Sequence, residues 1–113
     1  MEKILYSANL RNFEKEGEAF TFIHGENTVN IDFDDIQSIT LESNMSAKSG
    51  AYVLLSLDTN DISLVIESEH PEFFDLLFDI LCVELDVNMD EVFNISVANT
   101  KTKRTVYQKK QEE

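Results

Sequence analysis

Short runs of alternating apolar and polar residues fill the first two-thirds of the chain and stop at Pro71, its one proline. In 28–33, three apolar residues alternate with polar ones, which is the period of a strand with one solvated face. Residues 19–23 predict the partner strand, and 24–27 predict the hairpin turn that joins the two. This part of the chain therefore predicts antiparallel β-structure.

Further strands follow the same reasoning. Residues 36–41 predict a strand, 44–50 a polar and flexible loop, and 51–67 a second hairpin with a turn at 58–61. The first strand of that hairpin is nearly all apolar, which suits a strand covered on both faces. At the N-terminus, alternation over 4–10 predicts one more strand.

The pattern becomes helical after Pro71. Proline is tolerated in the first turn of a helix, and Glu69 and Glu72 suit the positive end of the helix dipole. The apolar arc covers more than half of the circumference, which is wider than a helix lying on one sheet needs. Either loops cover its flanks, or part of this surface meets another chain. An oligomer interface would use the phenylalanines Phe73, Phe74 and Phe78.

The segment that follows the helix has three interpretations, namely helix, hairpin or tail. Residues 83–90 alternate as a strand would, but Asn88 and Glu91 form a capping pair that favours a break and a short second helix. We favour the second helix. Alternation returns at 93–97, and a turn would lead the chain back into a strand at 104–107.

These elements predict an α+β fold. We expect a curved antiparallel sheet of five to seven strands with one main amphipathic helix at about 70–86. A chain of 113 residues, with eight phenylalanines and 42% hydrophobic residues, predicts one compact domain at 1–108 with a frayed tail at 109–113. The chain holds one cysteine and neither a membrane-length apolar run nor a signal-peptide pattern, so we expect a cytoplasmic protein.

Charge is distributed very unevenly along the chain. Eighteen of the 22 acidic residues fall between Glu16 and Glu91, where Lys48 is the one base. Residues 16–100 thus carry 18 acids and one base, a net −17, whereas 101–110 carry +5. This balance disfavours nucleic acid and anionic membranes as direct ligands and favours a basic protein partner. The alternative is that the acidity serves solubility alone.

The basic segment 101–110 leaves three interpretations open. A patch of this kind could touch nucleic acid, fold back onto the acidic body, or dock on the acidic face of a neighbouring molecule. The charge of the body opposes the first of these.

Catalytic motifs are lacking. His24 falls in a turn, His70 just precedes the helix, and Cys82 lies among apolar residues where a thiol behaves as a small hydrophobe. No nucleophile elbow, phosphate-binding loop or zinc spacing occurs, so we predict neither an enzyme nor a cofactor.

Calcium ligation is the one metal chemistry that the acids suggest. Asp86, Asn88 and Asp90 match the first three ligand positions of an EF-hand loop, but Glu91 stands where a glycine must turn and Val97 where a bidentate carboxylate must sit. A match that starts at Asp58 also breaks in its middle. We therefore predict no metal site.

The order of the elements resembles a bacterial PH-like (GRAM-like) domain over roughly residues 17–86. The resemblance lies in a first hairpin that ends in an alternating apolar run, a short step into the next strand, a second hairpin and then one helix. Those parts are Val29-Asn-Ile-Asp-Phe33, Phe33-Asp-Asp-Ile36-Gln-Ser-Ile39, 51–67 and the segment after Pro71. The resemblance implies a curved sheet plugged by the helix and a protein-binding scaffold. Lipid-binding members carry basic residues in the early loops, where this chain has Glu26 and no Lys or Arg.

Two functional hypotheses follow. The first is a small inhibitor or immunity-type protein that neutralises a basic partner, such as a nucleic-acid-binding protein, by charge complementarity. The acids expected to bind that partner are Asp32, Asp34, Asp35, Asp75, Asp79, Glu84, Asp86 and Asp90. The second is a PH-like adaptor or structural subunit that acts through homodimerisation or peptide binding at the Phe-rich helix.

Overall fold

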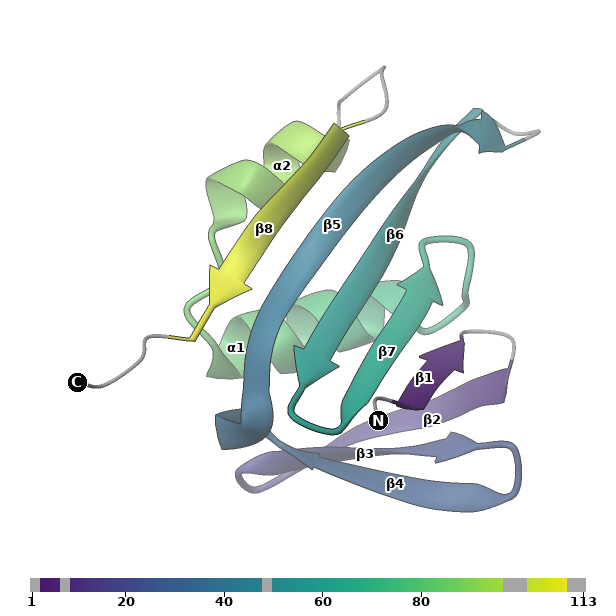
Figure 1. Cartoon of the computed structure of the whole chain (residues 1–113), viewed down its shortest axis with the longest axis vertical. Coiled ribbons are helices and arrows are strands. Elements are labelled where there is room, and N and C mark those ends of the chain that lie inside the picture. Colours follow the sequence, from purple (N-terminus) through teal and green to yellow (C-terminus); the bar gives the residue numbers. More distant parts are fainter. Residues whose placement is uncertain (1–2, 7–8, 48–49, 97–101, 110–113) are drawn as a thin grey trace.

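The computed structural model describes residues 3–6, 9–47, 50–96 and 102–109. In this part of the chain, eight strands form a five-stranded mixed sheet and a three-stranded antiparallel sheet, accompanied by two short helices (Figure 1). The predicted α+β class is confirmed. The single antiparallel sheet is not, because the strands divide between two sheets and one pair of them runs parallel.

The small sheet is a meander of three strands. It contains β2 (Leu10–Glu16), β3 (Ala19–His24) and β4 (Asn27–Asp32). Gly17 and Gly25 occupy the two turns with φ of 62° and 63°, a conformation that costs a glycine little. Phe20 pairs with Ile31 across β3 and β4, and both side chains are buried. The predicted first hairpin is therefore confirmed.

The large sheet has the order β1-β7-β6-β5-β8. Its central meander is β5 (Ile36–Ala47), β6 (Gly50–Thr59) and β7 (Ile62–Glu67), entered from β4 through the 3-10 turn η2 (Phe33–Asp35). The strand at 36–41 and the hairpin at 51–67 are confirmed. The predicted loop at 44–50 is wrong for 44–47 and for residue 50, because β5 and β6 pair there and backbone pairing overrides the polar composition. Residues 48 and 49 lie outside the described residues.

The chain termini supply the two edges of this sheet. β1 (Lys3–Tyr6) runs parallel to β7, and β8 (Thr102–Gln108) runs antiparallel to β5. The sequence predicts one strand over 4–10, but β1 ends at Tyr6 and β2 begins in the other sheet at Leu10. The predicted strand at 104–107 is confirmed as part of β8.

The predicted main helix is present over 73–84. It consists of a turn from Phe73, the π-helical segment η3 (Asp75–Leu81) and α1 (Cys82–Glu84). The wider winding appears in the bond from the Cys82 N–H to the Leu77 carbonyl, which spans five residues.

The favoured second helix is also present. α2 (Met89–Ser96) begins after Asn88, whose Oδ1 accepts the Glu91 N–H at 3.2 Å. The alternation at 93–97 does not correspond to a strand over 93–96, because this segment is helical, with Phe93 exposed and Ile95 buried. Residue 97 lies outside the described residues.

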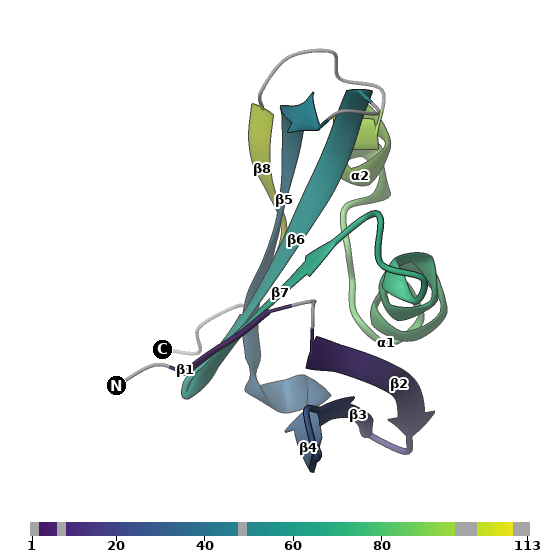
Figure 2. The ribbon, with the colours of Figure 1, turned by 90° about the vertical axis from the view of Figure 1, so that its right-hand side faces the viewer.

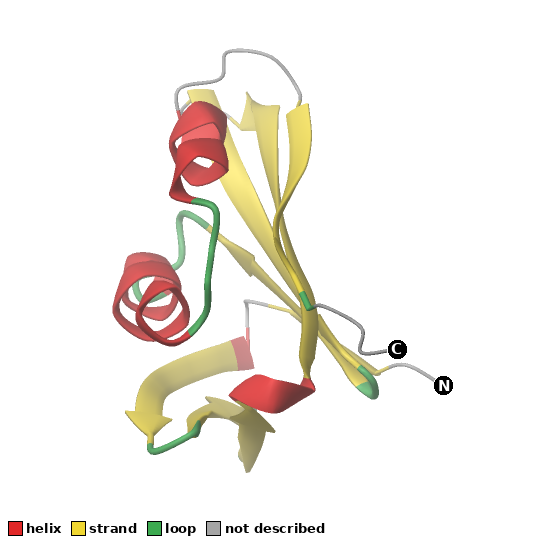
Figure 3. Cartoon of the chain, turned by 90° about the vertical axis from the view of Figure 1, so that its left-hand side faces the viewer, coloured by secondary structure: helices red, strands yellow, loops and turns green. Residues whose placement is uncertain are grey.

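Both helices lie on one face of the large sheet, and the small sheet closes the lower end of the same space (Figures 2 and 3). Buried side chains from both sheets and both helices meet there, among them Phe20, Phe22, Leu57, Leu64, Phe73, Leu76 and Ile95. No helix in the described ranges is long and apolar enough to cross a membrane.

Candidate functional site: an aromatic and acidic helix face

The solvent-facing side of the main helix carries two stacked phenylalanines. Phe74 is 57% exposed and Phe78 is 38% exposed, and their rings lie parallel within 1° with centroids 5.9 Å apart. Residues four apart fall on one side of a helix, which brings these rings together. Val83, also exposed, continues the apolar strip toward the end of the helix.

Phe73 belongs to the core instead. Its side chain is 1% exposed and meets the Phe74 ring edge-on, at 5.2 Å between centroids. Of the three phenylalanines predicted for an interface, two therefore face solvent and one does not. The apolar arc of the helix is wide partly because the helix packs against two sheets. Phe73 therefore lies in the core between them.

Asp75 and Asp79 form an acidic column beside the two rings. Each directly follows one of the exposed phenylalanines, and both carboxylates face solvent. No cation of the described residues lies within ion-pair distance of either. We call Phe74, Asp75, Phe78 and Asp79 the helix face.

Glu84 differs from the other predicted acids. Its Oε1 forms an ion pair with the Lys15 Nζ of β2. The two side chains are partly exposed, so solvent screens the pair and its contribution to stability is small, but it offsets the charge of Glu84. The salt bridge also connects the end of the helix to the small sheet.

Asp32, Asp34 and Asp35 lie together at η2, and all three are exposed. The Lys109 Nζ contacts the Asp34 carbonyl, and the Lys109 N–H donates to the Gln37 carbonyl at 2.8 Å. Lys109, where the sequence predicts a frayed tail to begin, thus lies on the acidic body. The other tail residues, 110–113, lie outside the described residues.

A small polar hollow of about 140 Å³ lies beside η2. Asp35 lines it from one side, and Thr59 and Asp61 line it from the turn between β6 and β7. Thr59 is already engaged, since its hydroxyl donates to the Ile62 carbonyl at 3.1 Å.

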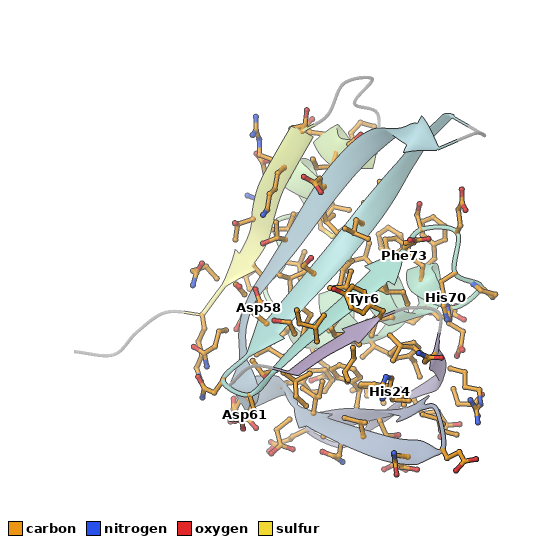
Figure 4. All side chains as sticks on the ribbon, turned by 45° about the vertical axis from the view of Figure 1, so that its right-hand side comes forward. Tyr6, His24, Asp58, Asp61, His70 and Phe73 are labelled. Carbon is orange, nitrogen blue, oxygen red and sulfur yellow. The ribbon has the colours of Figure 1, made fainter. Side chains whose placement is uncertain are left out.

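Asp86 lies on the linker between α1 and α2 (residues 85–88), and Asp90 lies in the first turn of α2. They flank Asn88, and both are exposed. Because the Asn88 side chain caps α2, it is not free to join them around a calcium ion. Asp58 is also engaged: it accepts the Ser63 hydroxyl at 2.6 Å and the Ser38 hydroxyl at 3.4 Å (Figure 4). Within the described ranges, no three His, Cys, Asp or Glu residues lie close enough to share a metal ion.

His70 and Glu72 hold the start of the helix on β2. The His70 Nε2 lies 2.7 Å from the Leu10 carbonyl, and the Glu72 N–H donates to Nδ1 at 3.0 Å, so the geometry fits the neutral Nε2–H tautomer (Figure 4). The Glu72 carboxylate accepts the N–H groups of Asn12 and Phe13. His70 is thus occupied by backbone contacts that fix the fold.

Cys82 is half-buried, and desolvation raises the pKa of its thiol. Such a thiol is less nucleophilic at neutral pH than a free one, because less of it is thiolate. This environment agrees with the interpretation of Cys82 as a packing residue.

A second hollow was not predicted from the sequence. It measures about 340 Å³ and is lined by Glu84 at the end of α1, by Leu85 and Asp86 of the linker, and by Tyr107 and Gln108 at the end of β8. About twenty residues separate its two sides, and no local pattern brings them together. The pairing of β8 with β5 and the bond from the Asn88 N–H to the Val106 carbonyl do so.

Comparison of the chain with protein-family models, with curated proteins and with solved structures finds no match. The PH-like resemblance therefore stays a prediction.

Proposed function

We propose that this protein is a non-enzymatic binding module that holds a basic protein partner on the helix face. The observation that carries the proposal is the stacked, exposed pair Phe74 and Phe78 next to Asp75 and Asp79, whose carboxylates form no ion pair with any described residue. Aromatic side chains supply much of the energy at the centre of protein interfaces, and charged neighbours select the partner.

The charge of the molecule supports a basic partner. All of the acids predicted for binding except Glu84 lack an ion pair within the described residues. Lysines or arginines of a partner would find these carboxylates available, and a net charge of −13 would accelerate the encounter by steering. A nucleic-acid-binding protein offers such a surface, so the proposed role is that of an inhibitor or immunity-type protein that covers it.

The proposal includes a PH-like scaffold. The order of elements supports this part of the proposal: a three-stranded meander is followed by a second three-stranded meander and then by a helix. The parallel pairing of β1 and the added strand β8 are departures from it. The cytoplasmic location and the absence of catalysis are likewise parts of the proposal.

Homodimerisation is the second candidate, favoured by the exposure of the stacked rings. A symmetric dimer on the helix face would also bring Asp75 and Asp79 near their counterparts, and like charges oppose that contact. Sedimentation at concentrations of micromolar to several hundred micromolar separates the two candidates. A concentration-dependent dimer abolished by Phe74→Ala would favour self-association.

The main test compares capture of proteins from the host lysate by the wild type, by Asp75→Asn/Asp79→Asn and by a matched control, Asp61→Asn/Glu67→Gln. The control removes two exposed charges that do not belong to the helix. We expect one basic protein to be captured by the wild type and the control, released at high salt, and lost with the helix variant. Equal capture by all three variants would exclude the helix face.

The captured protein is then purified for a second test. If the inhibitor role is correct, its nucleic-acid binding falls on addition of the wild type and is spared by Asp75→Asn/Asp79→Asn. Unchanged nucleic-acid binding in the presence of saturating wild type would leave a binding module without the inhibitory role.

A further inference from the structure

We propose that the 340 Å³ hollow between the linker and β8 binds the cationic side chain of a lysine or arginine. The inference rests on the proposed function, because it assigns a specific pocket to the basic partner. We call this hollow the cation pocket and define it by Glu84, Leu85, Asp86, Tyr107 and Gln108.

The position of the pocket is fixed by the backbone. The Asn88 N–H donates to the Val106 carbonyl at 2.7 Å, which attaches the linker to β8, and the Val87 N–H donates to the Leu85 carbonyl at 2.9 Å. The pocket lies next to these bonds, where residues 84–86 face 107 and 108. Its walls therefore belong to two segments that hydrogen bonds hold together.

The lining is chemically specific. Tyr107 and Leu85 are half-buried and packed against the core, so they offer a firm aromatic and apolar wall. Asp86 and Glu84 add carboxylates, and Gln108 adds an amide. An aromatic ring beside carboxylates suits a guanidinium or ammonium group with its aliphatic stem, through cation–π contact and charge-assisted hydrogen bonds. The same carboxylates repel anions.

Three cations of the described residues, two of them close to Tyr107 in the sequence, already have partners. Lys109, two residues beyond Tyr107, directs its Nζ to the Asp34 carbonyl, and Arg104 pairs with Glu91. Lys15 takes one oxygen of Glu84. Asp86 forms no ion pair with any described residue, so its charge is available to a ligand.

The pocket follows the helix face closely along the chain. Glu84 ends the helix that carries Phe78, roughly two helical turns earlier. A basic partner seated on the helix face would need only a short extension to place one side chain in the pocket. At about 340 Å³ the pocket is at the lower end of the roughly 300–1,000 Å³ range of ligand sites, which fits one side chain.

The test uses ethylguanidinium as the probe and the isotope-labelled full chain in NMR titrations. Ethylurea, neutral and nearly isosteric, is the matched control compound. We expect saturable shifts with ethylguanidinium at the amides of 84–86 and of 107 and 108 and at the Tyr107 ring, with none from ethylurea. Asp86→Asn should weaken binding roughly threefold or more, and the control variant Glu67→Gln, at an exposed acid of β7, should leave it unchanged.

The Tyr107 ring is tested separately. Tyr107→Phe keeps the aromatic face and should retain binding of ethylguanidinium, whereas Tyr107→Leu should lose it. If the leucine variant does not fold, Asp86→Asn and Tyr107→Phe still decide the test. Equal shifts from both compounds, unsaturated shifts across all acidic surfaces, or undiminished binding by Asp86→Asn would each overturn the pocket. The helix face is tested independently, by partner capture with Asp75→Asn/Asp79→Asn, which leaves the pocket residues unchanged. A failure of the pocket proposal can therefore be told apart from a failure of the proposed function.

Discussion

The Glu72 carboxylate accepts the backbone N–H of Asn12 at 2.8 Å, although 60 positions separate the two residues in the sequence. It also accepts the Phe13 N–H at 3.0 Å. The pairing of β2 with β3 is interrupted between Arg11 and Glu14, so these two N–H groups have left the strand ladder. Glu72 therefore supplies the acceptors that β3 does not, and it joins the helix to the small sheet.

Removing this carboxylate should be costly. Glu72→Ala leaves two backbone donors without their charged acceptor and should lower the free energy of unfolding by about 1–3 kcal/mol. Urea denaturation measures the change. Glu67→Ala, an exposed acid on β7, is the control and should stay within about 0.5 kcal/mol. Equal effects of the two substitutions would show that the Glu72 contacts contribute little.

Asn12 lies where the pairing of β2 with β3 is interrupted, and its φ is 59°. Asparagine and glycine tolerate this left-handed conformation, whereas a β-branched residue does not. Asn12→Gly should leave stability within about 0.5 kcal/mol, and Asn12→Val should lower it by about 1–3 kcal/mol. Glu14→Val, at a neighbouring position without a positive φ, is the control. A stable Asn12→Val variant would contradict the assigned backbone conformation.

Adjacent phenylalanines should differ sharply in their contribution to stability. Phe73 is buried, so Phe73→Ala should cost about 3–5 kcal/mol. Phe74→Ala removes an exposed ring and should cost less than about 1 kcal/mol. Thermal unfolding of the two variants decides the matter. A large loss for Phe74→Ala would mean that this ring stabilises the fold and is not reserved for a partner.

Cys82 should react slowly in the folded protein. Burial raises the pKa of its thiol, so less thiolate is present at pH 8 than in the unfolded chain. Reaction with a disulfide reagent should accelerate roughly tenfold or more in urea. Because the folded thiol has the higher pKa, its contribution to stability is complete below the ordinary thiol pKa and is lost as the pH rises through the folded value. Cys82→Ala should lack this loss of stability at alkaline pH. If the free energy of unfolding of Cys82→Ala fell with pH in the same way as that of the wild type, the prediction would be contradicted.

Local patterns predicted most of the elements. Period-two alternation, an apolar run at 51–57 and turn residues located the hairpins at 19–33 and 51–67, and Asn88 with Glu91 indicated the start of α2. Each depends on interactions between residues close in the sequence, which is where such patterns are informative.

The features that local sequence patterns did not predict depend on pairing between segments that are far apart in the chain. Alternation over 4–10 does not reveal that the chain changes sheets between Tyr6 and Leu10, because both halves have the same period. The adjacency of Phe74 and Asp75 was visible in the sequence, but the burial of Phe73 was not. The cation pocket depends on β8 lying beside β5, a pairing of residues that are 59 to 70 positions apart, from Ser43 with Thr102 to Ser38 with Gln108.

The parallel pairing of β1 with β7 sets an order on assembly during synthesis. The small sheet joins strands that are neighbours in the sequence, so it can form early, whereas closing the longer loop to β1 is slower. β1 leaves the ribosome before every other described strand, yet it has no partner until β7 has been made. We therefore expect the Leu5 amide to gain protection late in pulsed hydrogen exchange during refolding, after the amides of β3. Early protection at Leu5 would show instead that β1 finds another partner first.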